Sequence, residues 1–251
     1  MYILAIETTG PLCSVALVSE DENKKSIILA EETSTEAMNH LQELIPLTQK
    51  LFQKAGVEKS ALTHIAVSQG PGSFTGIRIG VSTARALGQA MNLPVIGIPT
   101  LEAFKYKDEA DKDAVICGIL NARRGQVYGI VEGYLEGCPC MLTDVLEILA
   151  GPVHQEEKKV LFFGDGIDAY EEKIKEILGE AGMKLGQEYD FAPEACRYQN
   201  AASVGRMACE KALAGEGLHY NDLHPEYMRK AEAEQKLEAG QLPICKLPKQ
   251  E

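Results

Sequence analysis

The chain has 251 residues, of which 37 are acidic and 25 are basic, and its formal net charge of -12 disfavours a protein that grips the nucleic-acid backbone through a basic face. A hydrophobic fraction of 45% is ordinary for a folded domain and excludes an intrinsically disordered protein. No stretch approaches the roughly 20 consecutive apolar residues that a membrane-spanning helix requires, so we expect no membrane partner.

The N-terminal part of the chain carries the pattern of an α/β unit. Short apolar runs between turn residues predict strands, and apolar residues at helical spacing predict helices. The first three strands, joined by short polar turns, should form an antiparallel meander. In chain order we expect strands at 2–6, 13–18 and 26–30, a helix at 35–55, a strand at 64–68, a helix at 74–91, a strand at 94–98 and a helix from 99.

A polar stretch at 106–113 predicts a domain boundary, after which the pattern recurs in a more open form. The expected elements are strands at 115–120 and 126–134 around a turn at 122–125, a strand or short helix at 141–149, a strand at 159–163, and helices at 170–181 and 201–214. The recurrence suggests two similar halves. We therefore predict an N-terminal lobe at 1–105, a C-terminal lobe at 106–223 and a tail at 224–251.

The most distinctive segment is the glycine-rich run GPGSFTGIRIG at 70–80, which joins a strand to a helix. A Walker A loop needs Lys directly after its closing glycine, but Ile77 stands there. A dinucleotide-binding loop needs a glycine where Thr75 stands, so this motif fails too. The loop either lets two backbones pack closely or offers free N–H groups to an anion, with Gly72 and Ser73 as the candidate contacts.

The helix at 74–91 has small residues at every fourth position, Gly76, Gly80, Ala84 and Gly88. Each interior glycine costs about 1 kcal/mol relative to alanine, so close packing must offset that cost. Because the helix is apolar nearly all round, we expect burial on more than one side. Either the helix packs only within its own lobe, or its second face meets another chain.

The run at 70–80 closely resembles the signature of the bacterial TsaB (YeaZ) family, as do the segments at 3–8, 122–128 and 225–229. The resemblance spans about residues 1–230. It implies a two-lobed fold like that of actin, the heat-shock ATPases and the sugar kinases (the ASKHA fold), with a mixed sheet flanked by helices in each lobe. It also implies a role in making threonylcarbamoyladenosine on tRNA, next to the anticodon.

TsaB-like proteins are usually not the catalyst: they pair with the related transferase TsaD and work with the ATPase TsaE. The resemblance thus implies a non-catalytic subunit whose helices at about 36–55 and 75–91 dock against those of TsaD. Alone, the same surface should form a homodimer, and contact with tRNA should be only indirect. The expected interface residues are His40, Leu44, Leu51, Ile77, Gly80, Val81, Ala84 and Gly88.

The superfamily that this chain resembles holds ATP and Mg²⁺ with acids on the first hairpin of each lobe. Here the first lobe offers Glu7 and Thr8, whereas Asn121 and Gln126 stand where relatives tend to carry acids in the second. Neutral amides supply no charge for a hard cation. We therefore expect no cofactor on this chain alone, with ATP and Mg²⁺ only in the complex. Asp165 either contacts a nucleotide or caps the next helix.

Cysteine and histidine usage points away from metal chemistry. The seven cysteines, an odd number, are typical of reduced thiols in the cytoplasm. The close pair Cys138 and Cys140 has no further ligand at useful spacing, and the five histidines form no His-x-x-x-His pair. We expect no metal and no catalytic residue. The alternatives are an active ASKHA-type ATPase or kinase, a glycoprotease-like peptidase, or an anion-binding module without a partner enzyme.

Overall fold

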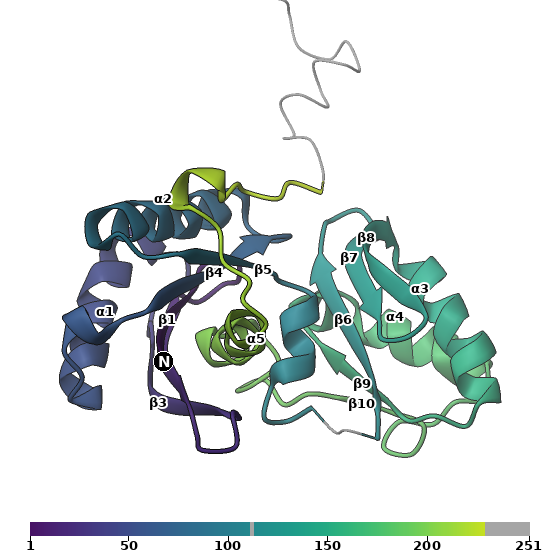
Figure 1. Ribbon diagram of the computed structural model, residues 1–251. Helices are drawn as coiled ribbons and strands as arrows, with labels where there is room; N and C mark the ends of the chain where they lie inside the picture. Colours follow the sequence, from purple (N-terminus) through teal and green to yellow (C-terminus); the bar gives the residue numbers. More distant parts are fainter. Residues whose placement is uncertain (111–112, 229–251) are drawn as a thin grey trace, which may run out of the picture.

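The computed structural model describes residues 1–110 and 113–228, which form two lobes side by side (Figure 1). Each lobe is built on a five-stranded mixed sheet. The two-lobed α/β architecture expected from the sequence is therefore confirmed. Within the described part of the chain, the helices are too short or too polar to traverse a bilayer.

The first sheet has the strand order β3-β2-β1-β4-β5. Its opening strands pair antiparallel, which confirms the predicted meander, and β4 and β5 then add in parallel. The strands are β1 (Tyr2–Glu7), β2 (Ser14–Glu20), β3 (Ser26–Thr33), β4 (His64–Gly70) and β5 (Val95–Pro99).

Two helices, α1 (His40–Ala55) and α2 (Phe74–Met91), cover one face of this sheet, with a short 3₁₀ turn at Lys59–Ala61 after α1 (Figure 1). The Ser73 hydroxyl caps α2 by accepting a hydrogen bond from the Gly76 N–H.

The second sheet repeats the connectivity of the first, with the order β10-β9-β6-β7-β8. Its strands are β6 (Val115–Asn121), β7 (Gln126–Val131), β8 (Leu135–Met141), β9 (Val160–Phe163) and β10 (Tyr189–Phe191). The outer face carries α3 (Leu142–Ile148), a π-helical turn (Leu149–Val153) and α4 (Gly166–Glu180). The two halves are thus copies of one plan, as the recurrence in the sequence suggested.

In each half of the chain, the helix that follows the last strand contacts the sheet of the other lobe. The 3₁₀ helix η2 (Glu102–Tyr106) follows the first sheet, but its Phe104 packs in the core of the second lobe. The ring centroids of Phe104 and Phe163 lie 5.7 Å apart. Conversely, α5 (Ala201–Leu213) follows the second sheet and covers the inner face of the first (Figure 1).

The predicted boundaries of the C-terminal lobe, 106–223, are therefore wrong at their C-terminal end. Residues 201–213 form α5, which packs on the first sheet, and the following segment stays on that lobe through a bridge between Leu218 and Val95. A 3₁₀ turn at Tyr220–Asp222 then packs against α2. Of the predicted tail, residues 229–251 lie outside the described part of the chain.

Candidate functional site

The residues that follow β1 hold the glycine-rich loop in place through hydrogen bonds. The Thr8 hydroxyl donates a 2.7 Å hydrogen bond to the Gly76 carbonyl, and the Ser73 N–H donates one of 2.8 Å to the Thr9 carbonyl. A Cβ on Gly76 would overlap the Thr8 carbonyl oxygen, and a Cβ on Gly80 would overlap the Thr8 hydroxyl. The small residues of α2 therefore let this helix approach β1 of its own lobe.

This packing overturns the predicted partner interface. The named positions all lie in the interior of the first lobe, because the buried stripes of α1 and α2 face their own sheet. Side chains this buried cannot contact another chain without unfolding the lobe. The corrected positions are His40, Leu44, Leu51, Ile77, Gly80, Val81, Ala84 and Gly88.

His40 illustrates the correction. Its ring is 3% exposed, and Nε2 lies 3.0 Å from the Gly10 carbonyl oxygen, so the histidine ties the start of α1 to the turn after β1. Its Nδ1 atom is buried and has no hydrogen-bond partner among the described residues. The residue holds the lobe together rather than presenting a contact to a partner.

The outward side of α1 and the loop before it present a different set of apolar side chains. Met38, Leu41 and Ile45 are 66%, 75% and 47% exposed, and we call them the α1 patch. Their spacing places Leu41 and Ile45 on one side of the helix. Sequence periodicity detected this amphipathic helix but did not distinguish its buried face from its exposed face, because both faces carry leucine.

Glu7 and Thr8 do not reach a ligand cavity among the described residues. Glu7 is fully buried and accepts hydrogen bonds from the Thr9 backbone, from the Thr9 hydroxyl at 2.7 Å and from the Ser68 hydroxyl. Burial raises the pKa of the Glu7 carboxyl, although the Ser68 and Thr9 hydrogen bonds oppose the shift. The predicted ligand role of Glu7 and Thr8 is therefore corrected: both fasten β1 beneath the glycine-rich loop.

Gly72, Ser73 and Asp165 lie together in the lining of a cavity of about 390 Å³ between the lobes, which we call the interlobe cavity. Gln199 also lines it, and no local sequence signal marked this residue. The remaining lining residues are Thr9, Gly10, Pro11, Met38, Phe74, Leu120, Asn121, Ala122, Arg123 and Tyr128.

Asp165 stands at the start of α4, but its side chain does not cap that helix. Instead its carboxylate accepts a 2.9 Å hydrogen bond from the Asn121 N–H, and burial raises the pKa of the Asp165 carboxyl. The Asn121 side-chain oxygen in turn accepts from the Arg123 N–H at 2.8 Å. The end of β6 and the start of α4 thus form one polar wall of the interlobe cavity.

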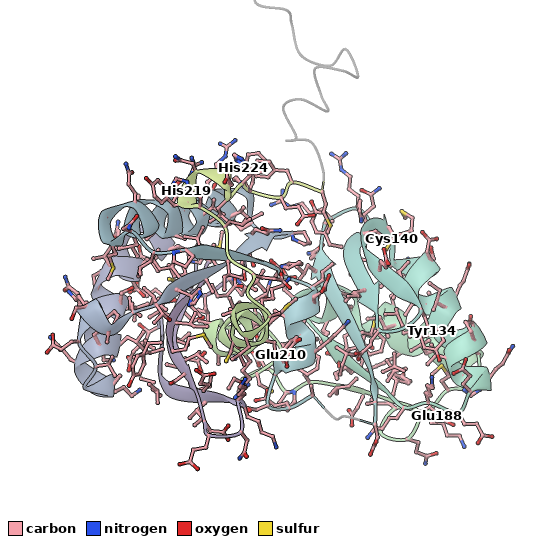
Figure 2. All side chains as sticks on the ribbon, in the orientation of Figure 1. Tyr134, Cys140, Glu188, Glu210, His219 and His224 are labelled. Atoms are coloured by element: carbon pink, nitrogen blue, oxygen red, sulfur yellow. The ribbon has the colours of Figure 1, made fainter. Side chains whose placement is uncertain are left out.

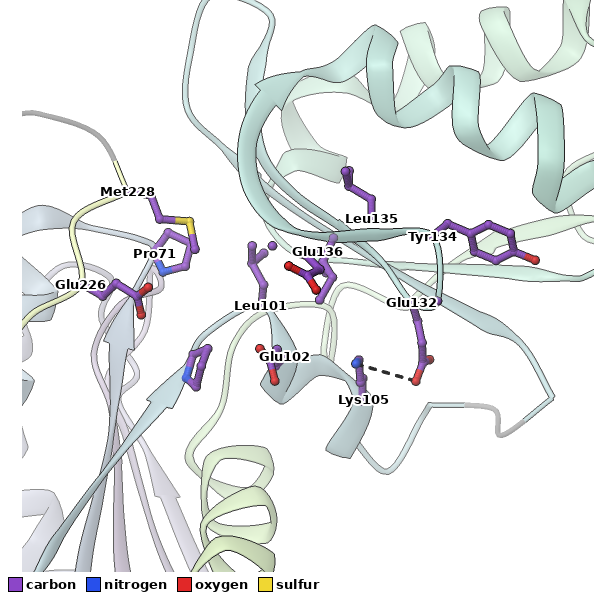
Figure 3. Close-up of a pocket in the computed structure, with 14 residues that line it drawn as sticks. Pro71, Leu101, Glu102, Lys105, Glu132, Tyr134, Leu135, Glu136, Glu226 and Met228 are labelled. Atoms are coloured by element: carbon purple, nitrogen blue, oxygen red, sulfur yellow. Dashed lines mark ion pairs between the residues drawn. The ribbon is translucent and has the colours of Figure 1, made fainter. Parts of the chain in front are cut away.

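A second cavity, of about 650 Å³, has Pro71 in its lining and is rich in carboxylates (Figure 3). Among the described residues that line it, Lys105 is the one basic side chain, and it reaches Glu132 at 4.0 Å. The acidic side chains in its lining are Glu102, Glu132, Glu136 and Glu226.

Histidines and cysteines are spread over both lobes. His219 and His224 lie on the segment beside α2, whereas Cys140 lies on the second lobe (Figure 2). Within residues 1–110 and 113–228, no three His, Cys, Asp or Glu side chains are grouped closely enough to hold a metal ion. Burial raises the pKa of the Cys13 thiol to about 12 and disfavours its reactive thiolate form.

Comparisons with known proteins agree with the resemblance in the sequence. The family model described as "TsaD: tRNA N6-adenosine threonylcarbamoyltransferase" matches residues 28–237. The tRNA threonylcarbamoyladenosine biosynthesis protein TsaB of Bacillus subtilis is 31% identical over 247 residues, which are 94% of this chain and 97% of the relative. The TsaB protein of Escherichia coli is 27% identical over 250 residues, 94% of this chain and 98% of the relative.

A crystal structure of a Pseudomonas aeruginosa protein with similarity to peptidase YEAZ has the same fold. Its TM-score is 0.69 at 23% identity, and the match covers 91% of this chain and 99% of that one. A second structure, YeaZ from the same organism, has a TM-score of 0.65 at 24% identity, covering 90% and 99% of the two chains. On its sequence similarity over nearly its whole length, and on its fold, this chain belongs to the TsaB (YeaZ) family.

Proposed function

We propose that this chain is a non-catalytic subunit in the biosynthesis of threonylcarbamoyladenosine on tRNA. In this role it pairs with the transferase TsaD through the α1 patch and the adjoining outer side of α2, and it acts together with the ATPase TsaE. The relatives' shared name supports the pathway. The α1 patch is the observation that carries the pairing.

The α1 patch exposes large apolar side chains that water solvates poorly. Grouped exposed apolar residues on a folded chain mark surfaces that bind another protein. On α2, the short side chains of Ser82 and Ala86 are exposed to solvent, which leaves room for another helix. The same surface explains the homodimer that we expect when TsaD is absent, since two copies can cover each other's patches.

Two positions, at the ends of β1 and β6, support the non-catalytic role. Glu7 is enclosed by its own hydrogen bonds, and the corresponding position of the second lobe carries the neutral Asn121. We therefore propose that this chain alone binds neither ATP nor Mg²⁺ and that both enter only in the complex. The net charge of -12 supports indirect contact with tRNA, and the reduced thiols support a cytoplasmic location.

The test is the double variant Leu41→Glu with Ile45→Glu. We expect it to fold normally but to be monomeric in sedimentation, to lose co-purification with the cognate TsaD and to lose tRNA modification in a reconstituted reaction. Leu185→Glu is the matched control, because Leu185 is 46% exposed but lies on the second lobe. Retained pairing by the double variant, or full modification of tRNA without this chain, would overturn the proposal.

A catalytic role would show itself in a different way. If the purified chain alone hydrolysed ATP or a peptide, and Asp165→Ala removed that activity, the ATPase or peptidase alternative would replace the proposal. Asp165 is the informative position because, in the part of the chain that the structure describes, it is the one carboxylate that lines the interlobe cavity.

A further inference from the structure

Strand β8 of the second lobe carries two thiols that the proposed docking does not use. Cys138 and Cys140 lie on this strand with Pro139 between them, and both cysteines are free and half-buried. Because side chains alternate across a strand, residues two positions apart lie on the same face of the sheet. The two thiols are therefore neighbours on one face of β8.

The neighbouring strand β7 leaves room for the two sulfur atoms to approach each other. Cys138 pairs with Gly129 of β7, and Cys140 pairs with Val127. A Cβ added to Gly129 would lie only 3.1 Å from the Sγ atom of Cys140. The Cys140 sulfur is thus displaced along the sheet toward the position of Cys138, over a residue that has no side chain.

The two thiols also interact directly. Burial raises the pKa of the Cys140 thiol to about 12, and the neighbouring Cys138 adds to the shift through its charge and through a hydrogen bond. A hydrogen bond that raises the pKa of a thiol is one in which that thiol is the donor, so the Cys140 S–H donates to the Cys138 sulfur. Cys140 therefore stays protonated at neutral pH, which leaves the role of attacking thiolate to Cys138.

A disulfide between these two residues is within reach of the backbone but strained. Each residue of a strand advances the chain by about 3.3 Å, so the two Cα atoms lie about 6.6 Å apart. Disulfides span Cα separations of about 4.4–6.8 Å, and most are shorter than about 6 Å. Closure must therefore draw the two residues together. Strand β8 can yield because it stands at the edge of its sheet, with β7 as its one neighbour in the described part of the chain.

We propose that Cys138 and Cys140 form a reversible disulfide by exchange with a small-molecule disulfide such as oxidised glutathione, with Cys138 as the attacking thiol. The strain in the closed form makes the bond easy to reduce, so it would open again in an excess of thiol. This site lies in the second lobe and goes beyond the proposed docking role, which uses the outer sides of α1 and α2 in the first.

The exchange balances in two steps. The Cys138 thiolate, having lost its proton to water, attacks one sulfur of oxidised glutathione; a new S–S bond forms, and the second glutathione leaves as a thiolate. That thiolate takes the proton of Cys140, whose sulfur attacks the Cys138 sulfur and displaces the first glutathione. The displaced thiolate takes a proton from water. The two cysteines together lose two electrons, and one glutathione disulfide is reduced to two thiols.

The first experiment incubates the full chain with oxidised glutathione, blocks the remaining thiols with iodoacetamide in denaturant and digests the protein with trypsin. Cleavage after Arg124 and Lys158 releases the peptide 125–158, whose cysteines are Cys138 and Cys140 alone. We expect this peptide to lack two hydrogen atoms and both blocking groups, and to be doubly blocked again after treatment with excess reduced glutathione. A peptide that stays doubly blocked, that carries glutathione without closing, or that stays closed in excess reduced glutathione would overturn the proposal.

The second experiment compares single serine variants, each first shown by its melting temperature to be folded. Cys140→Ser keeps the attacking thiol and should trap one glutathione on the peptide 125–158. Cys138→Ser should take up glutathione at least about tenfold more slowly, because the remaining thiol is the protonated one. Cys196→Ser removes a half-buried cysteine outside β8 and is the control, which should close the disulfide as the parent does. Equal rates in Cys138→Ser and Cys140→Ser would overturn the proposal.

Discussion

The hydroxyl of Thr8 donates a 2.7 Å hydrogen bond to the main-chain carbonyl of Gly76, which lies 68 residues later in the chain. This contact joins the end of the central strand β1 to the first turn of α2. It requires that α2 approach β1 almost to backbone contact, which only a helix with small residues on that side can do. The glycine-rich run at 70–80 is thus explained by packing within the first lobe.

The first prediction concerns that close approach. Gly76→Ala places a methyl group on the Thr8 carbonyl oxygen, so β1 and α2 must move apart. We expect the free energy of unfolding to fall by about 1–3 kcal/mol, as for other overpacked interiors. Urea denaturation followed by far-UV circular dichroism measures the change.

Gly179→Ala is the matched control for this substitution. Gly179 lies in α4, and a Cβ added there meets no other atom within 4 Å. Alanine should therefore stabilise the chain by about 0.5–1 kcal/mol through helix propensity. If Gly76→Ala were stabilising as well, the proposed contact between β1 and α2 would be contradicted.

Most elements of the first lobe could be predicted from the sequence because each has a strong local pattern. The helix predicted at 74–91 is α2, with the same boundaries, since Ser73 caps one end and Asn92 adopts a left-handed conformation at the other. Gly56 ends α1 in the same left-handed conformation. Local chemistry fixed these boundaries.

Elements that depend on distant partners could not be predicted in this way. Strand β8 contains Cys138, Pro139 and Cys140 and lacks apolar alternation; proline is tolerated there because β8 is an edge strand. Strand β10 has only 3 residues. The sequence also predicts that α2 is buried on more than one side, but the structure leaves Ser82 and Ala86 exposed on its outer side. No local pattern marks Gln199, which reaches the interlobe cavity from the segment before α5.

The second prediction follows from the buried carboxyl of Glu7. Because burial raises its pKa above the ordinary value of 4.5, the folded chain keeps this proton to a higher pH than the unfolded chain does. The contribution of Glu7 to stability is therefore full below about pH 4.5 and is lost as the pH rises through the folded-state pKa.

Glu7→Gln removes this titration while retaining a side chain of similar shape. We expect the variant to lose less stability than the parent over the pH range above about 4.5, measured by urea denaturation at each pH. A parent protein whose stability rises over that interval relative to Glu7→Gln would contradict the raised pKa. The readout requires no ligand or partner.

The third prediction has the opposite sign. Glu32 on β3 pairs with Lys50 at 2.5 Å and Lys54 at 2.8 Å, both on α1, and hydrogen bonds from these lysines lower its pKa. The stabilisation is present above the unfolded-state pKa of 4.5 and is lost as the pH falls through the lowered value.

We expect Glu32→Gln to lower stability at neutral pH by no more than about 1 kcal/mol, because both lysines are largely exposed to solvent. The difference from the parent should shrink in high salt and vanish in acid. A difference that stays constant from neutral pH into acid would show that Glu32 acts by packing rather than by charge.

The last prediction separates the two sides of α2. Ala84 is 0% exposed in the core of the first lobe, so Ala84→Arg must bury a guanidinium group among apolar side chains. An unpaired buried charge costs several kcal/mol, and we expect this variant to misfold rather than to lose pairing selectively.

Ala86→Arg lies on the exposed side of the same helix and should fold normally while weakening pairing with TsaD and with a second copy. Near-UV circular dichroism and sedimentation measured on both variants distinguish the two effects. If Ala84→Arg were well folded and monomeric, this prediction would be contradicted. Position 84 would then have to be exposed, and the small residues of α2 would belong to the partner interface.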